Sequence, residues 1–293
     1  MKLLALARRF CVGFAATLVL AGAAPALAEP ALWVVRDADS TLYLFGTAHV
    51  LRPDVSWRSP KIDKAFAESN ELVVEVKQPE SPADLQALIG RYGIDPARPL
   101  SSRLDAADKA RLAAAAQAMG LPAPALEPMR PWFAALTLSL APIVKAGYDP
   151  QSGVEMVLTA QAKAGNKPVA ALETMEQQIR FFADMAPEAE LAMLRATLAD
   201  VDDAAAMLDA LVAAWVSGDA AALEAAFITE MRRDYAEAYD VLIVRRNEDW
   251  ADQIVEKLQG SGVSFIAVGA GHLVGPDSVQ EKLARRGVRA ERF

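Results

Sequence analysis

The residues best suited to chemistry are the two histidines, His49 and His272, the only histidines in the chain. Each closes a Gly-x-x-His motif that directly follows an apolar run rich in β-branched and aromatic residues. Such runs predict β-strands, so each motif predicts an imidazole at the C-terminal edge of a sheet. Ligands of α/β proteins bind at that edge. For either histidine alone the alternative is an ordinary hydrogen-bonding role in a loop, but the pair favours a functional site.

Two glutamates are placed to join the histidines. Glu173 follows a predicted strand over 169–172, and Glu75 lies late in a predicted strand over 71–76. If these strands are parallel neighbours of those before His49 and His272, all four side chains converge. Two imidazoles with one or two carboxylates are typical ligands of Zn²⁺, Mn²⁺, Fe²⁺ or Co²⁺. Structural alternatives remain: Glu75 could face outward from its strand, and Glu173 could favour the N-terminus of the next helix.

Other common catalytic machinery has no sequence signal. We find no Gly-x-Ser-x-Gly elbow, no phosphate loop and no dinucleotide fingerprint. A Ser-His-Asp triad stays open, although no serine stands out. The single cysteine, Cys11, lies in the N-terminal segment, so the rest of the chain has no thiolate nucleophile, disulfide or cysteine-ligated metal.

Residues 1–28 have the features of a secretory signal peptide. Lys2, Arg8 and Arg9 precede an apolar stretch over 11–24, and Ala26–Ala28 forms a small-x-small cleavage site. An uncleaved anchor is the alternative, but the apolar stretch is short for a membrane span. We therefore expect a mature chain over 29–293 that is periplasmic or secreted.

The charge balance argues against two classes of partner. Of the 30 basic residues, 27 remain after the three in the signal segment, against 38 acidic residues, a formal net charge of −11. Nucleic acids and anionic membranes attract basic surfaces, so we expect no nucleic-acid partner. No later apolar stretch reaches spanning length, and we expect no stable membrane span after signal cleavage.

The predicted elements give an α/β fold with a central mixed β-sheet, flanking helices and a large helical middle segment, about 100–258, in a single domain over 29–293. The two ends are strand-rich. Strands are predicted over 32–36, 41–45, 71–76, 169–172, 263–268 and 288–293, and helices over 60–69, 105–119, 132–146, 154–164, much of 173–258, and 278–286. The last strand, helix and strand form a βαβ-like unit.

Several segments together resemble the TraB/GumN family. The similarity runs in order from about residue 31 to 293, nearly the whole predicted mature chain. It is carried by Leu44–His49, Gly147–Glu155, Ala171–Thr174, Arg246-Asn247 with Trp250, and Ala267–Gly275.

The resemblance implies an α/β fold and, by similarity to Tiki ectodomains, a metal-dependent protease acting on peptides. The wider superfamily also includes erythromycin esterases and a haem-binding lipoprotein. By resemblance, His49 and His272 are metal ligands, and Glu75, Glu155 and Glu173 are carboxylate candidates for ligand or general base. Arg246 could neutralise an oxyanion or hold one of these carboxylates.

The sequence therefore predicts an exported, metal-dependent hydrolase acting on peptide bonds. The metal would be Zn, Mn, Co or Fe, held by His49, His272 and Glu155, and Glu173, Glu75 and Arg246 would be catalytic. The main alternative is a non-catalytic periplasmic binding module for a peptide, haem or other small-molecule ligand. A structural partner in envelope assembly is a third possibility.

Overall fold

The computed structural model describes residues 29–79, 81–201 and 203–293. The predicted signal peptide, residues 1–28, lies outside the described residues. The described chain builds one six-stranded sheet in the order β4-β3-β5-β2-β1-β6. The strands are β1 Leu32–Arg36, β2 Ser40–Thr47, β3 Glu71–Val76, β4 Val169–Glu173, β5 Gly262–Gly269 and β6 Glu291–Arg292.

The sheet is mixed, as expected. Strands β4, β3, β5 and β2 are parallel neighbours, whereas β1 runs antiparallel between β2 and β6. The hairpin β1–β2 turns at Asp37, whose carboxylate accepts from the backbone N–H groups of Asp39 and Ser40, an Asx-type turn. The four parallel strands end at one edge, and this edge carries the candidate site.

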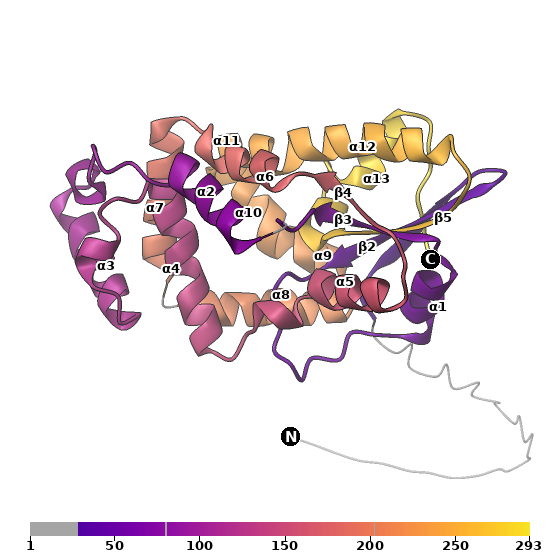
Figure 1. Cartoon of the computed structure of the whole chain (residues 1–293), viewed down its shortest axis with the longest axis horizontal. Helices are drawn as coiled ribbons and strands as arrows, with labels where there is room; N and C mark the ends of the chain where they lie inside the picture. Colours follow the sequence, from indigo (N-terminus) through magenta and orange to yellow (C-terminus); the bar gives the residue numbers. More distant parts are fainter. Residues whose placement is uncertain (1–28, 80, 202) are drawn as a thin grey trace, which may run out of the picture.

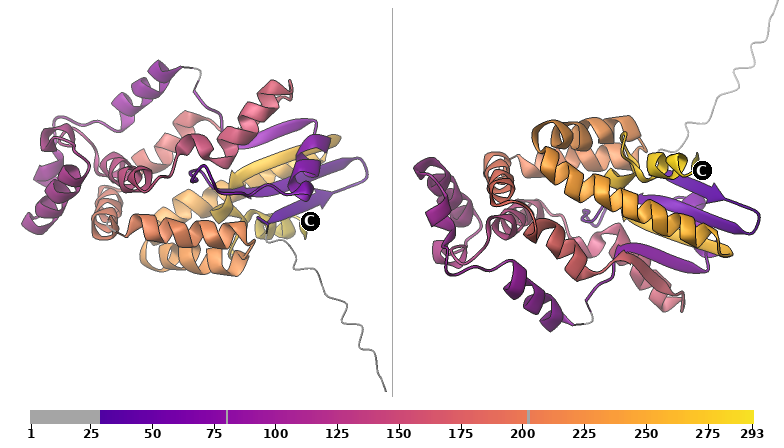
Figure 2. Two further views of the ribbon diagram at one scale, coloured as in Figure 1. Left: turned by 90° about the horizontal axis from the view of Figure 1, so that it is seen from below. Right: turned by 90° about the horizontal axis from the view of Figure 1, so that it is seen from above.

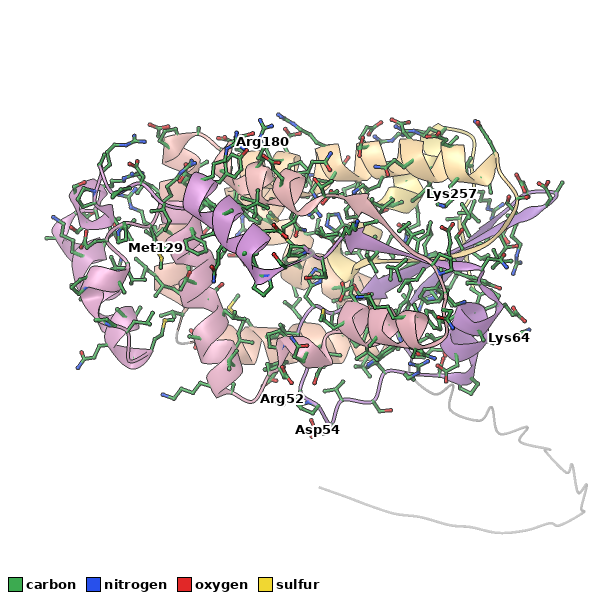
Figure 3. The ribbon with its side chains drawn as sticks, in the orientation of Figure 1. Arg52, Asp54, Lys64, Met129, Arg180 and Lys257 are labelled. Carbon is green, nitrogen blue, oxygen red and sulfur yellow. The ribbon has the colours of Figure 1, made fainter. Side chains whose placement is uncertain are left out.

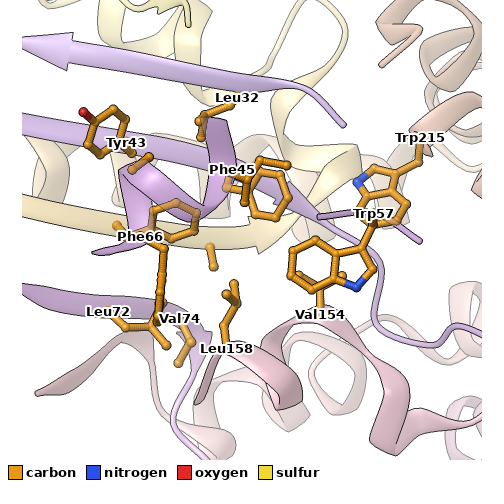
Figure 4. Packing of buried hydrophobic residues seen from close by; sticks show 14 of the residues in the cluster. Leu32, Tyr43, Phe45, Trp57, Phe66, Leu72, Val74, Val154, Leu158 and Trp215 are labelled. Carbon is orange, nitrogen blue, oxygen red and sulfur yellow. The ribbon is translucent and has the colours of Figure 1, made fainter. Parts of the chain in front are cut away.

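Helices cover both faces of the sheet (Figure 1). One face packs on α1 Pro60–Glu68, α5 Val154–Ala164, α8 Ala204–Val216 and α9 Ala220–Leu223, through aromatic residues that include Phe45, Trp57 and Trp215 (Figure 4). The other face packs on α12 Arg245–Leu258 and α13 Val279–Arg285. Because both faces are covered, β5 is apolar along most of its length and buried from Ser264 to Gly269, as expected for a parallel strand.

Part of the helical middle segment lies beyond the sheet edge and does not cover the sheet (Figures 1 and 2). Helices α3 Ala106–Ala118, α4 Pro131–Lys145 and α7 Pro187–Asp200 enclose a core that includes Leu100, Leu138 and Leu194. Helices α2 Pro82–Tyr92, α4 and α6 Met175–Ala183 pack around Trp132. Two short π-helical turns, over 224–228 and 240–244, interrupt the later helices. The remaining α-helices of the described residues are α10 Thr229–Asp234 and α11 Ala236–Tyr239.

Two sequence expectations were wrong. Helix α2, Pro82–Tyr92, is absent from the helices predicted from the sequence. Ser81 in fact caps the helix and Pro82 occupies its first turn, where proline is tolerated. The C-terminal strand is also not the second strand of a βαβ unit. Strand β6 has only two residues and pairs antiparallel with β1, away from β5.

The outer surface is charged. Long side chains such as Lys64 and Arg180 lie on the outside of the molecule (Figure 3), with side-chain exposures of 67% and 56%. Across the described part of the chain, no helix combines the length and the apolar character needed to cross a membrane.

Candidate functional site

The two Gly-x-x-His loops lie side by side at the C-terminal edge of the sheet. Strands β2 and β5 are parallel neighbours that end in register, Gly46 opposite Val268 and Thr47 opposite Gly269. On the other side of β5, strands β3 and β4 carry Glu75 and Glu173 to the same edge. The expected convergence of four strand ends is therefore confirmed.

His49 is held by Glu155. The imidazole Nδ1 lies 2.7 Å from Glu155 Oε1, and the hydroxyl of Thr47 donates to the same carboxylate oxygen. Glu155 stands in the first turn of α5, whose N-cap residue is Gly153. A Cβ at Gly153 would lie 2.1 Å from the carbonyl oxygen of His49, so glycine lets the helix start directly against the histidine loop. Because Nδ1 faces a carboxylate, it carries the hydrogen, and Nε2 is directed elsewhere.

His49 Nε2 faces Glu75 across a gap of 3.9 Å to Oε2. Glu75 is fixed on its other sides: Oε2 accepts from the Gly269 backbone N–H at 3.0 Å, and Oε1 accepts from Gln178 at 2.9 Å and from Arg246. A Cβ at Gly269 would lie 2.9 Å from His49 Nε2 and 3.3 Å from Glu75 Oε2. The second motif therefore needs glycine here because two functional groups approach its backbone.

Arg246 of α12 occupies the space between the carboxylates. It donates through Nε and Nη2 to the two oxygens of Glu173, at 2.8 and 2.9 Å, and through Nη2 to Glu75. Trp250 donates to Glu173 at 2.8 Å as well. Arg246 also lies over the Trp250 ring at 4.8 Å. Of its two expected roles, Arg246 thus fills that of holding carboxylates, and it holds both.

His272 is buried and both of its ring nitrogens are engaged. Nδ1 lies 2.6 Å from Asn247 Oδ1, and Nε2 lies 3.2 Å from Arg246 Nη1. Because an arginine can only donate, Nε2 is the acceptor and Nδ1 carries the hydrogen. The amide of Asn247 is fixed in the matching orientation, since its Nδ2 donates to the carbonyl groups of His272 and Asp277. The imidazole also packs on Trp250 with ring centroids 4.3 Å apart.

The environment shifts the two imidazoles in opposite directions. The charge of Glu155 raises the pKa of His49 to about 9, aided by their hydrogen bond and by Glu75 and opposed by burial. Burial lowers the pKa of His272 to about 3, so it is a neutral imidazole at pH 7. The His49 side chain is 62% exposed. Its ring nevertheless lies between the carboxylates of Glu155 and Glu75, and both raise its pKa.

The carboxylates respond to burial and to the cations around them. Burial by itself would raise the pKa of Glu75, but the positive charges of His49 and Arg246, with the hydrogen bond from the Gly269 N–H, lower it to about 2. For Glu173, burial raises the pKa, and its hydrogen bonds from Arg246 and Trp250 oppose that shift.

Two cavities open beside this group. One, of about 540 Å³, is bordered by His49, His272 and Arg246 at the sheet edge and by helices α8 to α10. The other, of about 460 Å³, is bordered by α5 and by Glu155. His49 and Glu75 line both cavities, whereas Glu173 lines neither. Of the predicted site residues, Glu173 is thus the one that is closed off from a ligand.

A metal centre with three protein ligands does not fit this arrangement of side chains. Within the described ranges, no group of three or more His, Cys, Asp or Glu side chains is placed to hold a metal ion. The ring nitrogen of His272 that faces the site accepts from Arg246. Two atoms that could bind a metal face one another, His49 Nε2 and Glu75 Oε2. The residues therefore offer two ligand positions, fewer than the three protein ligands of catalytic zinc sites.

The family model that describes the TraB/PrgY/gumN family matches residues 31–292. The chain belongs to this family. Among its relatives is a protein of Treponema pallidum (strain Nichols) named "Uncharacterized protein", 25% identical over 288 residues, covering 90% of this chain and 84% of the relative. No solved structure matches the chain.

Asn247 and Trp250 belong to a family motif, but the sequence predicted no role for either residue. Asn247 orients His272, and Trp250 donates to Glu173. Both stand on the buried face of α12 with Arg246, Ala251 and Ile254. Three hydrogen-bonding side chains at i, i+1 and i+4 on an otherwise apolar helix face were a usable signal, because buried polar groups need partners. Gln178, which holds Glu75, had no comparable signal.

Proposed function

We propose that the protein is a hydrolase acting on amide bonds such as those of peptides, with His49 as the base that activates water. The observation that carries the proposal is the gap between His49 Nε2 and Glu75 Oε2, 3.9 Å wide, at the boundary of two cavities. A water molecule bridging these two atoms from the side of the gap would meet the carboxylate acceptor of Glu75 and, when His49 is unprotonated, the acceptor Nε2. The other nitrogen of His49 is tied to Glu155, as in other histidine–carboxylate pairs that orient a base.

In the proposed reaction, unprotonated His49 takes a proton from water through Nε2 while the oxygen attacks the substrate carbonyl. Glu155 stabilises the resulting imidazolium, which then returns the proton to the leaving nitrogen. Gln178 donates one N–H to Glu75 and borders both cavities. We assign its amide to bind the substrate carbonyl. General base catalysis of this kind contributes about 10²- to 10⁴-fold.

Arg246, Glu173 and His272 have a positioning role in this proposal. All five N–H groups of Arg246 lie toward protein acceptors, namely Glu173, Glu75, His272 and the Leu242 carbonyl. Arg246 therefore fixes Glu75 rather than binding an oxyanion itself. Glu173, with both oxygens engaged and no contact with a cavity, fixes Arg246. The role of general base, expected at one of Glu75, Glu155 and Glu173, is assigned instead to His49.

A second candidate is the metal-dependent hydrolase that the sequence predicts, but with the divalent cation held by His49 and Glu75 instead of by His49, His272 and Glu155. It is favoured by the facing donors of His49 and Glu75, which would hold the ion and leave its other positions to water and substrate. A bound cation would lower the pKa of a water ligand. The residues of this chain would then act by holding the ion, and His49 would bind in its neutral form.

Turnover of a quenched-fluorescence peptide library by the purified protein tests the proposal. We expect cleavage that falls about 10²-fold or more in Glu155→Gln and His49→Ala. Glu188→Gln, an exposed glutamate of α7, is the matched control and retains full turnover. Assays in EDTA and after addition of Zn²⁺, Mn²⁺ or Co²⁺ separate the two candidates, because only the second requires metal.

The absence of turnover under every condition, with binding of library peptides retained, would refute the hydrolase and support the binding-module alternative.

We also propose that the protein is exported to the periplasm or secreted, on the basis of residues 1–28. Mass spectrometry of the mature protein would then find Glu29 at its N-terminus. A full-length protein retained in the inner membrane would contradict export.

A further inference from the structure

The two cavities beside His49 differ in character. The larger one, about 540 Å³, has polar side chains only where it meets the sheet edge, and its remaining walls are apolar. The smaller one, about 460 Å³, has polar and charged side chains along its length, among them Gln151, Thr159 and Lys163. His49, Glu75 and Gln178 belong to both linings. A ligand spanning the boundary would thus pass over the proposed catalytic groups with one end in each cavity.

The apolar walls offer almost no hydrogen bonds to a ligand. They come from helices and helical turns, whose backbone groups pair internally, with side chains such as Leu211, Val212 and Phe227. The indole N–H of Trp215 is the polar group of these walls, and it donates to the Gly46 carbonyl at 2.7 Å. An occupant that carries its own polar groups would therefore bury them without partners.

We propose that the substrate carries an aliphatic chain on the carbonyl side of its scissile bond. The chain occupies the apolar cavity, the carbonyl carbon lies over the gap between His49 and Glu75, and a polar head group extends into the second cavity. This proposal rests on the hydrolase function proposed above and adds the substrate class. It covers acyl chains linked to a peptide and acyl chains of lipids, because both present the same chain and carbonyl.

An alkyl chain fits these walls better than an extended peptide does. Every residue of a peptide brings an N–H and a C=O, and leaving such groups unpaired on burial is costly. A methylene brings none, and its burial strengthens binding by roughly fourfold. The volume of about 540 Å³ lies within the usual range of small-ligand sites. The exposed Phe227 ring, 42% accessible, and Leu136 border the cavity, so a chain can enter from the surface.

The reaction on such a substrate is balanced hydrolysis. Water adds its hydroxyl to the acyl carbon, and the bond from that carbon to the amide nitrogen or ester oxygen breaks. The other proton of the water molecule passes through His49 Nε2 to the leaving nitrogen or oxygen. The products are a fatty acid and an amine or alcohol, and no oxidant or further reactant is needed.

Binding of unreactive straight-chain alcohols tests the substrate class without any turnover. Calorimetric titration of the full-length mature protein with 1-butanol to 1-decanol is expected to show Kd falling roughly fourfold per methylene. Leu211→Trp, which fills the cavity, is expected to weaken the binding of 1-decanol more than the binding of 1-butanol. Phe227→Ala, which removes part of the cavity wall, is expected to weaken the binding of both alcohols. Leu140→Trp, on the exposed face of α4 and outside the cavity lining, is the control and binds like the parent.

Hydrolysis assays then separate the two sources of acyl chain. N-octanoyl peptides and octanoyl glycerol are the probes, with acetyl analogues as references. A chain-length preference on either head group supports the proposal and identifies the source. Alcohol binding that does not depend on chain length, or a tetraleucine amide that binds more tightly than 1-decanol, would overturn it. Alcohol binding as expected, with no hydrolysis of any probe, would refute the hydrolase and leave the aliphatic site intact.

Discussion

Replacing Arg246 with methionine gives the sharpest test of how the site is built. The Arg246 side chain is 6% exposed and pairs with Glu75 and Glu173, which are 6% and 2% exposed. Methionine keeps much of the volume but leaves two buried carboxylates without their cation. Removing one partner of a buried ion pair costs about 3–5 kcal/mol. For a chain of this size we expect Tm to fall by roughly 6–20 °C.

The measurement is thermal unfolding followed by circular dichroism at pH 7, with Lys257→Met as the matched control. Lys257 pairs with Glu71 on the surface, and their side chains are 30% and 26% exposed, so its loss costs at most about 1 kcal/mol. The double variant R246M/E173Q removes one of the two buried carboxylate charges that R246M leaves unpaired, and is expected to be more stable than R246M alone.

The pH dependence of the same variant has a defined sign. Without Arg246, burial raises the pKa of both carboxyls above the unfolded value of about 4.3. The stability cost of their charge is therefore present at pH 7 and shrinks as pH falls toward 4.5. The parent keeps its stabilisation by Glu75 over this window, because its folded pKa is about 2. A fall in Tm for R246M that is no larger than that for K257M would refute the proposed role of Arg246. A fall in Tm that becomes larger on acidification would refute it as well.

Further predictions concern the histidines and the second glycine motif. In the apo protein, NMR titration is expected to give a pKa of about 9 for His49, and His272 stays neutral down to about 3. The pairing of His49 with Glu155 therefore stabilises the fold below pH 6.5, and this contribution is lost as pH rises through 9; similar pKa values for both rings would contradict it. Below pH 9, kcat/KM is expected to rise about tenfold per pH unit if His49 is the base, and a flat profile would reject that role. His272→Ala is expected to lower Tm more than His49→Ala, since only His272 is buried with both nitrogens bonded; equal melting temperatures would argue otherwise. Gly269→Ala is expected to displace His49 and reduce turnover by about 10²-fold, whereas unchanged turnover would show that the close approach is dispensable.

The sheet edge could be predicted from sequence because its signals are local. The apolar, β-branched and aromatic residues of 41–45 and 263–268 predict strands, and each Gly-x-x-His follows at once. Parallel strands end at a common edge, so His49 and His272 had to approach one another once β2 and β5 paired. Family resemblance added Glu155 and Arg246, which no local pattern would have joined to this edge.

What the sequence could not determine is how the converged groups share their charges. Arg246 lies 171 residues from Glu75 and 73 from Glu173 in the chain, and its reach depends on where α12 packs against the sheet. Once there, it satisfies both carboxylates and the ring nitrogen of His272, and leaves His49 to Glu155. Composition and spacing identify donors and acceptors, but a buried hydrogen bond depends on distances of a few tenths of an ångström between side chains from separate elements. Only tertiary packing fixes those distances, and with them which residues face the cavities and which hold the others in place.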